Sequence, residues 1–447
     1  MVKYLGTRLY FTNESIIRMR LNILYGTAAI VILLIVISLR GIIFSGVAYA
    51  DGGNMRLPHR VVEHHDEVNL EHFNHLFMAV EIGQRKMAVV NIYSEFPDYL
   101  YAIEPNEGFA CVDDAARAIV MLSEYIKRHP SDEIKHKIKL LVEFILYMQN
   151  DNGYFNNFIW HDLSINTSYR TSIAEMNWWS FRALWSLEVA HDLVAFDADL
   201  TGRIEKAVDK AMVRIKRDLA APHHKIENVE TISLPTWLPG KYAADQSAVA
   251  IIALLPYYKR SADAQIPLII DGLARGIMQM QKGDENNFPY GMFLSWKNNW
   301  HAWGNSQAYA LLLAGRQLDR KDYIRSALRE IDYFYPYLLR QGFPGSISIR
   351  REAGIFVKAG EQSFPQIAYG IRPMVFALSE AYNITGDKKY SARLAEVKSW
   401  FTGNNRAAEI IYDRKSGRTY DAIVSPSGIN MNSGAESTIE GLLVRLR

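Results

Sequence analysis

Small and aliphatic residues recur at helical spacing in six segments of the chain, each with a polar or acidic opening. The segments begin at Val112, Met176, Ala244, Asn305, Ala368 and Asn432. Successive starts lie about 64 residues apart, and a steady period indicates one supersecondary unit used repeatedly. Apolar and small residues occupy nearly every face of each predicted helix, which indicates helices that are buried on most sides.

Six further helices are predicted between these segments, each amphipathic with a charged outer face. They begin near Glu67, Ser131, Leu200, Ala262, Lys321 and Asp387. Six hairpins of one inner and one outer helix predict an all-α fold, an (α/α)6 toroid of six inner and six outer helices over residues 67–447. A linear solenoid is the alternative. It would need polar caps at both ends, whereas the last helix is as apolar as the others.

The predicted connections differ in length. Those from an inner helix to the next outer helix are mostly short, and those from an outer helix to the next inner helix run to about 20–28 residues, a length that is usually functional in a compact domain. All the long loops must emerge at the N-terminal ends of the inner helices. They therefore predict a funnel whose floor is formed by helix N-termini with their partial positive charge.

The N-terminal segment is predicted to lie outside the toroid. Residues 21–39 contain no charge, and several basic residues precede them. An apolar stretch of bilayer-spanning length behind a positive flank predicts export, as a cleaved signal peptide or a retained membrane anchor over residues 1–50. Residues 51–66 would be a linker, and the toroid would be extracytoplasmic, secreted or anchored. A buried core helix is the weaker alternative, because nothing amphipathic marks the segment.

Composition narrows the possible partners and cofactors. Hydrophobic residues make up 49% and charged residues 22% of the chain, and the formal net charge is +2. This balance gives no electrostatic reason to expect nucleic acid as a partner. Cys111 is the only cysteine, which excludes intramolecular disulfides and zinc or iron–sulfur sites built from Cys. We expect no metal and no cofactor.

Aromatic side chains are concentrated in the long loops. Eight of the nine tryptophans lie there or in the first turns of the inner helices. Aromatic faces beside polar side chains suit sugar rings, whose C–H faces stack while their hydroxyls form hydrogen bonds. The predicted substrate-binding residues of this kind are Trp160, His161, Arg170, Trp178, Trp300, His301, Trp303 and Tyr369. The alternative is that these aromatics only pack the loops onto the ring.

Carboxylates recur at the predicted starts of the inner helices. Crowded carboxylates raise one another's pKa, which creates the acid/base pair that glycoside cleavage requires. Asp114 and Glu436 rank first as catalytic residues, because each lies beside small residues that leave room for a ligand. Glu175 and Asp245 complete the predicted catalytic set. Asp113 is predicted to contact the substrate, to orient a neighbour or to cap its helix, and capping is the alternative for every one of these acids.

Several motifs support this interpretation by their order and spacing. They are CVDDAARAIVML, DNGYFNNFIW, RALWSL, YDRKSGRTYDAI and NSGAESTIEGLL. Together they resemble the motifs of the six-hairpin glycosidase superfamily over about residues 67–447, and most nearly bacterial (α/α)6 carbohydrate-processing domains with a DD-N/A-ARA motif. The resemblance implies glycoside hydrolysis. Related toroids also include polysaccharide lyases, uronate epimerases and phosphorylases, so it specifies the fold better than the reaction.

The sequence therefore predicts a carbohydrate-active enzyme, in the first place a glycoside hydrolase acting on an oligo- or polysaccharide. The first alternative is a polysaccharide lyase or uronate epimerase, which would abstract the C5 proton with Tyr or His and neutralise the carboxylate with Arg or Lys. The second alternative is a non-catalytic glycan-binding toroid. A terpene cyclase is unsupported, because Asp113 and Asp114 are followed by Ala115, Ala116 and Arg117 instead of an aspartate-rich motif.

Overall fold

The computed structural model describes residues 68–219 and 225–447. The predicted signal peptide or anchor and the predicted linker lie outside the described residues. Within these two stretches, no helix combines the length and the apolar character needed to cross a bilayer.

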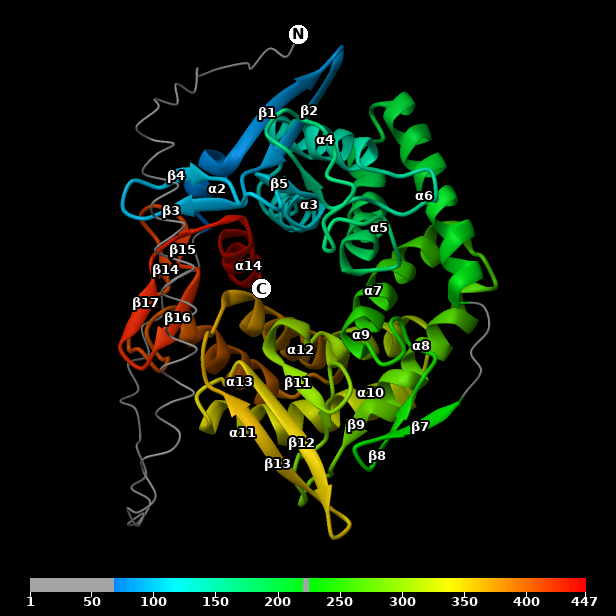
Figure 1. Ribbon diagram of the computed structural model, residues 1–447, viewed down its shortest axis with the longest axis vertical. Helices are drawn as coiled ribbons and strands as arrows, with labels where there is room; N and C mark the ends of the chain where they lie inside the picture. Colours follow the sequence, from blue (N-terminus) through cyan, green and yellow to red (C-terminus); the bar gives the residue numbers. More distant parts are fainter. Residues whose placement is uncertain (1–67, 220–224) are drawn as a thin grey trace. The chain divides into compact units, whose positions relative to one another are not determined.

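Six helices form an inner ring, and each begins within three residues of a predicted start. They are α3 (Val112–Ile126), α5 (Trp178–His191), α7 (Ala244–Ser261), α9 (Gln307–Gln317), α12 (Ala368–Thr385) and α14 (Ala435–Arg445). Each inner helix packs against the next, and α14 packs against α3, so the ring closes (Figure 1). This closure confirms the toroid and excludes the linear solenoid.

Outer helices pack against the inner helices that precede them in the chain. They are α4 (Asp132–Tyr147), α6 (Ala198–Leu219), α8 (Ile266–Met280), α10 (Lys321–Arg329) and α13 (Lys388–Lys398). Helix α10 continues through a π-helical turn, η3 (Glu330–Phe334), into α11 (Tyr335–Arg340). Short 3-10 helices are η1 (Asp192–Val194), η2 (Ala302–Gly304) and η4 (Ser399–Phe401).

The outer helix predicted near Glu67 is much shorter than expected. It is α2 (Glu71–Leu76), and a hairpin of β1 (Phe77–Ile82) and β2 (Arg85–Val90) follows it at once. Gly83 lies in the left-handed region at φ +62°, which turns the chain between the two strands. Strand β2 packs against α4. The hairpin therefore contributes to the outer layer together with the short helix α2.

The long connections contain short antiparallel strands that the helical pattern did not predict. They are β3 (Tyr93–Glu95), β4 (Leu100–Ala102), β5 (Ala110–Cys111), β6 (Phe158–Ile159), β7 (Ile226–Val229), β8 (Ile232–Pro235), β9 (Gln281–Lys282), β10 (Met292–Phe293), β11 (Asn299–His301), β12 (Ser346–Glu352), β13 (Ile355–Gln362), β14 (Tyr412–Asp413), β15 (Arg418–Thr419), β16 (Ala422–Ser425) and β17 (Gly428–Asn430). Strands β11, β12 and β13 form one sheet, and the others pair two by two.

Two features of the inner helices position the loops that surround the site. Strand β5 leads directly into α3 and pairs with β6, which ties the start of α3 to the loop between α4 and α5. Small residues on the inner helices let backbone and loops approach closely. A Cβ atom at Gly441 of α14 would lie 2.0 Å from Oγ1 of Thr419, and one at Gly370 of α12 would lie 2.8 Å from Cβ of Ala302.

Candidate active site

A cavity of about 570 Å³ opens at the N-terminal ends of α3, α12 and α14. Its size is within the usual range for small-molecule sites. The lining includes Tyr93, Glu107, Asp113, Asp114, Arg117, Asn157, Tyr369, Asp421 and Glu436. The predicted funnel therefore has its cavity to one side of the ring, where the first helical repeat meets the last two.

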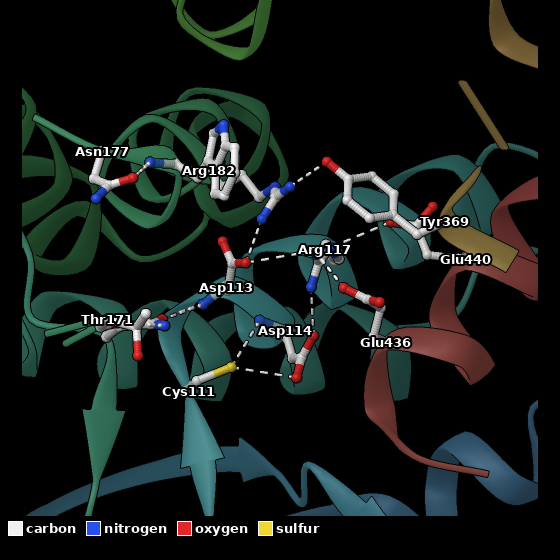
Figure 2. A network of polar contacts seen from close by, with 12 residues as sticks. Cys111, Asp113, Asp114, Arg117, Thr171, Asn177, Arg182, Tyr369, Glu436 and Glu440 are labelled. Carbon is white, nitrogen blue, oxygen red and sulfur yellow. Dashed lines mark hydrogen bonds and ion pairs between the residues drawn. The ribbon is translucent and has the colours of Figure 1, made fainter. Parts of the chain in front are cut away.

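Four carboxylates surround the guanidinium of Arg117 at the base of this cavity (Figure 2). Its Nη1 donates to Oδ1 of Asp114 at 2.7 Å. Its Nη2 lies 2.8 Å from Oε2 of Glu436 and 3.4 Å from Oδ2 of Asp113, and its Nε lies 3.2 Å from Oε1 of Glu440. Helices α3 and α14 supply all five groups, so the closure of the ring assembles this cluster.

Two further arginines extend the network to the neighbouring inner helices. Arg182 of α5 donates to Oδ2 of Asp113 and to the hydroxyl of Tyr369 on α12. Arg372 of α12 donates to Oε2 of Glu440 at 2.5 Å. The guanidinium carbons of Arg117, Arg182 and Arg372 lie 4.9, 5.2 and 5.2 Å from the centre of the Tyr369 ring, within the range of cation–π contacts. Sequence reasoning did not identify Arg117 or Arg182 as site residues.

The adjacent aspartates Asp113 and Asp114 have different surroundings. The side chain of Asp114 is 4% exposed, and it accepts from Arg117 through Oδ1 and from the Cys111 thiol through Oδ2 at 3.2 Å. Burial raises the pKa of Asp114. The side chain of Asp113 is 18% exposed. Burial would raise the pKa of Asp113, but the guanidiniums of Arg182 and Arg117 outweigh it, so this pKa lies below its usual value.

Glu436 differs from both aspartates because its side chain is 41% exposed and lines the cavity. The low-dielectric walls around the carboxyl raise its pKa from 4.5 to about 7, although Arg117 acts in the opposite direction. Glu436 and Asp113 thus have pKa values that are shifted apart while they share Nη2 of Arg117. A pair of this kind can hold one protonated and one ionised carboxyl at neutral pH.

Two more acids in the cavity wall were not among the predicted site residues. Glu107 accepts from the hydroxyl of Tyr93 at 2.5 Å, and Asp421 accepts from Oγ of Ser437 at 2.5 Å and from the amide of Gly434 at 2.9 Å. Burial raises the pKa of both carboxyls. Both lie in irregular loops, where helical periodicity gives no signal. Across the described ranges, no three His, Cys, Asp or Glu side chains are grouped so that they could hold a metal ion.

Two of the four predicted catalytic acids lie outside this cavity. Glu175 is exposed, precedes α5 and accepts from Nδ2 of Asn177 at 3.2 Å. Asp245 is buried in the first turn of α7, where its Oδ2 lies 3.1 Å from Nε2 of His301. The inner helices start at points spread around the ring, so first-turn acids do not all converge. Only Asp114 and Glu436 of the set are brought together.

The predicted sugar platforms are also distributed differently from expectation. Trp300 is 2% exposed and packs edge-on against Phe334 at 5.4 Å, so its ring belongs to the core and cannot stack on a ligand. This prediction was wrong because β11, which carries Trp300, pairs with β12 and directs the indole inward. The other predicted residues that are absent from the lining, among those the structure describes, are Trp160, His161, Arg170, Trp178, His301 and Trp303. Tyr369 does line the cavity.

No protein-family model matches the sequence, and no curated protein matches it either. Solved structures do match the fold. A sugar epimerase from a ruminal bacterium is 12% identical, with 80% of this chain and 91% of that chain covered and a TM-score of 0.57. The cellobiose 2-epimerase of Bacillus thermoamylovorans is 11% identical over 80% and 92% of the two chains, with a TM-score of 0.54. A family 76 glycoside hydrolase from a bovine Bacteroides thetaiotaomicron strain is 10% identical over 83% and 82%, with a TM-score of 0.50.

The chain has an (α/α)6 toroid fold, which these solved structures share. The fold that the motifs led us to expect is therefore confirmed. Their identities to this chain are low, and the likeness therefore establishes the fold alone. The reaction has to be argued from the geometry of the site.

Proposed function

We propose that the protein is a carbohydrate-active enzyme, and specifically a glycoside hydrolase that cleaves an oligo- or polysaccharide. One observation carries the proposal. Two carboxyls with pKa values shifted in opposite directions, Glu436 and Asp113, face a cavity and share one guanidinium nitrogen of Arg117. The matched solved structures support the substrate class, since they are sugar epimerases and a glycoside hydrolase.

In this mechanism Glu436 is the general acid. With a pKa of about 7 it is about half protonated at neutral pH and largely protonated below it, and it gives its proton to the leaving glycosidic oxygen. Asp113 is the ionised partner that attacks the anomeric carbon or activates water. Because both lie within 3.4 Å of Nη2 of Arg117, the two contacting oxygens are at most about 6 Å apart. That upper limit lies below the spacing of about 6.5–9.5 Å in inverting enzymes, which favours the retaining arrangement with its spacing of about 5–5.5 Å.

Asp114, which ranked with Glu436 from the sequence, has a different role in this proposal. Both of its oxygens are engaged, one by Arg117 and one by the Cys111 thiol, and its side chain is 4% exposed. We assign it to positioning Arg117, which in turn contacts Glu436 and Asp113. Glu175 and Asp245 remain predictions from the sequence, without a place in the cavity.

The test is turnover by isosteric variants on a panel of plant, microbial and uronate-rich glycans. Glu436→Gln and Asp113→Asn are each expected to lose about 10²-fold or more of turnover while circular dichroism stays unchanged, because general acid–base catalysis contributes about 10²–10⁴-fold. Asp98→Asn removes an exposed carboxylate outside the cavity and serves as the matched control. Activity within a few-fold of the parent for both cavity variants would refute the assignment.

A lyase or uronate epimerase is the second candidate, and one feature favours it. Tyr369 lines the cavity and its hydroxyl accepts from Arg182, a placement that suits a tyrosine base beside a cation. Product analysis separates the reactions. Hydrolysis releases reducing ends without ultraviolet absorbance, a lyase releases an unsaturated product that absorbs in the ultraviolet, and an epimerase changes the configuration without cleavage. A non-catalytic toroid would give none of these products.

We also propose export, from the pattern of residues 1–50 alone. The uncharged run at residues 21–39 behind basic residues supports a signal peptide or an anchor. Fractionation of cells that produce the full chain, and N-terminal sequencing of the product, would distinguish a cleaved from a retained segment. Recovery of the intact chain from the cytosol would contradict both.

A further inference from the structure

The charges that line the cavity are strongly unequal. Five carboxylates face it, and Arg117 is the one basic residue of the lining among the described residues. The five acids are Glu107, Asp113, Asp114, Asp421 and Glu436. A cavity walled by one sign of charge attracts ligands of the opposite sign and repels those of the same sign.

The arginines of the site have no capacity left for an acidic ligand. The side chain of Arg117 is 5% exposed and contacts four carboxylates. Arg182 is 4% exposed and is held by Asp113 and Tyr369, and Arg372 is 5% exposed and is held by Glu440. Each guanidinium is buried and already neutralised, so none can turn toward a bound carboxylate without breaking a buried ion pair, which is strongly unfavourable.

Glu107 and Asp421 carry the excess negative charge. Within the described ranges, no ion pair joins either carboxylate to a basic side chain, and their hydrogen bonds come from the neutral donors Tyr93, Ser437 and Gly434. Exposed Arg170 lowers the pKa of Glu107, but burial raises it more. Both side chains are partly buried, and a partly buried carboxylate without a counter-ion is stabilised by a cation bound beside it. These two carboxylates therefore leave an excess of negative charge in the wall, which a cationic ligand can balance.

We propose that the cavity selects a saccharide unit bearing an ammonium group, an unacetylated amino sugar, over its N-acetylated counterpart, and that it rejects uronates. This inference rests on the proposed function, because it names the substrate class of the same site. Glu107 and Asp421 are the specificity-determining residues, and their carboxylates form hydrogen-bonded ion pairs with the ammonium group. The same wall repels the carboxylate of a uronic acid.

The experiment separates binding from catalysis. Glu436→Gln protein, which keeps the shape of the cavity, is titrated by calorimetry at low salt with three oligosaccharides of matched length. These are β-1,4-linked glucosamine, the fully N-acetylated oligomer and oligogalacturonate. We expect the glucosamine oligomer to bind at least tenfold more tightly than the N-acetylated one, a difference that shrinks as salt is added, and no measurable binding of the galacturonate.

The variants test the assignment to Glu107 and Asp421. Glu107→Gln and Asp421→Asn, each combined with Glu436→Gln, are expected to reduce the preference for the glucosamine oligomer several-fold. Asp98→Asn in the same background removes an exposed charge outside the lining and should leave the preference unchanged. Equal or tighter binding of the N-acetylated oligomer or of the galacturonate overturns the proposal, as does a preference that both cavity variants retain.

Failure of this inference can be told apart from failure of the proposed function. Hydrolysis of a neutral glycan by the parent protein, together with no preference for the amino sugar, would support the proposed hydrolase activity and refute the proposed substrate class. Tight binding of the glucosamine oligomer without any cleavage by the parent protein would support the substrate class and refute the hydrolase.

Discussion

Two glutamates one helical turn apart on α14 are expected to affect stability in opposite directions. Glu436 and Glu440 both contact Arg117, but the side chain of Glu436 is 41% exposed to the cavity and that of Glu440 is fully buried. The perturbation is the replacement of each by glutamine, which keeps the shape and removes the charge. The free energy of unfolding of both variants is then compared with that of the parent protein as a function of pH.

For Glu436 the magnitude follows from its raised pKa. A carboxyl that binds its proton more tightly in the folded state loses stability as pH rises from its unfolded pKa of 4.5 to its folded pKa of about 7, and the loss is constant above that. Each pKa unit corresponds to about 1.4 kcal/mol, so the limit is about 3 kcal/mol. Solvent at the exposed part of the side chain screens the effect, and we expect about 1–2 kcal/mol. Glu436→Gln should therefore be more stable than the parent at pH 8.5 and nearly equal to it at pH 4.5.

For Glu440 the sign is reversed. It accepts from Nε of Arg372 at 2.5 Å and lies 3.2 Å from Nε of Arg117, with no exposure to solvent. Removing one partner of a buried ion pair leaves the remaining charges uncompensated, at a cost of about 3–5 kcal/mol. Glu440→Gln should be less stable than the parent at both pH values.

Urea unfolding of the three proteins at pH 4.5 and 8.5, followed by circular dichroism and by tryptophan fluorescence, measures these differences. A Glu436→Gln variant that is less stable than the parent at pH 8.5 would refute the reasoning. It would mean that the attraction of Arg117 for the ionised carboxylate exceeds the cost of its burial. The pKa of Glu436 would then be too low for a general acid at neutral pH.

Two further predictions concern neighbouring parts of the molecule. Arg117→Gln removes a cation that lowers the pKa of Asp113. The acidic limb of the pH profile of kcat/KM should therefore move to higher pH. An acidic limb that stays in place would contradict the role of Asp113 as the ionised partner. Trp300→Ala should lower the free energy of unfolding by about 3–5 kcal/mol, because the ring is 2% exposed in the core. Saccharide binding measured by calorimetry should be unchanged, and a loss of binding at unaltered stability would restore Trp300 as a platform.

The helical ring could be predicted from the sequence because each inner helix is apolar on nearly every side. Residues Val112, Ala244 and Ala368 begin helices at the positions that the repeat predicted. The hairpin after α2 could not be predicted in the same way. Strand β1 follows α2 directly, in the region where the sequence predicted an outer helix, and its partner β2 packs against α4. Local periodicity carries no information about such a contact.

The aromatic residues of the loops show a second limit of the sequence. The positions of the tryptophans in the long loops predicted that several stack on a sugar, but burial depends on the register of short strands. Trp300 pairs with Ile347 across β11 and β12, and this register directs its ring toward Phe334. His301, the next residue along the strand, is directed instead to Asp245 of α7 and stacks on Trp303. Strand register is a non-local property, and the two side chains could not be told apart beforehand.

The choice between Asp113 and Asp114 depends on how α3 is rotated about its own axis. Adjacent residues of a helix point about 100° apart, so the two side chains cannot share one environment. The pairing of β5 with β6 and the packing of α3 against α5 and α14 set this rotation. It places Asp114 against Cys111 and leaves Asp113 beside Arg182 and the cavity. Because Glu436 reaches the same guanidinium only when α14 closes the ring on α3, the proposed acid/base pair is brought together by contact between the first and last repeats, and no segment of the sequence contains it alone.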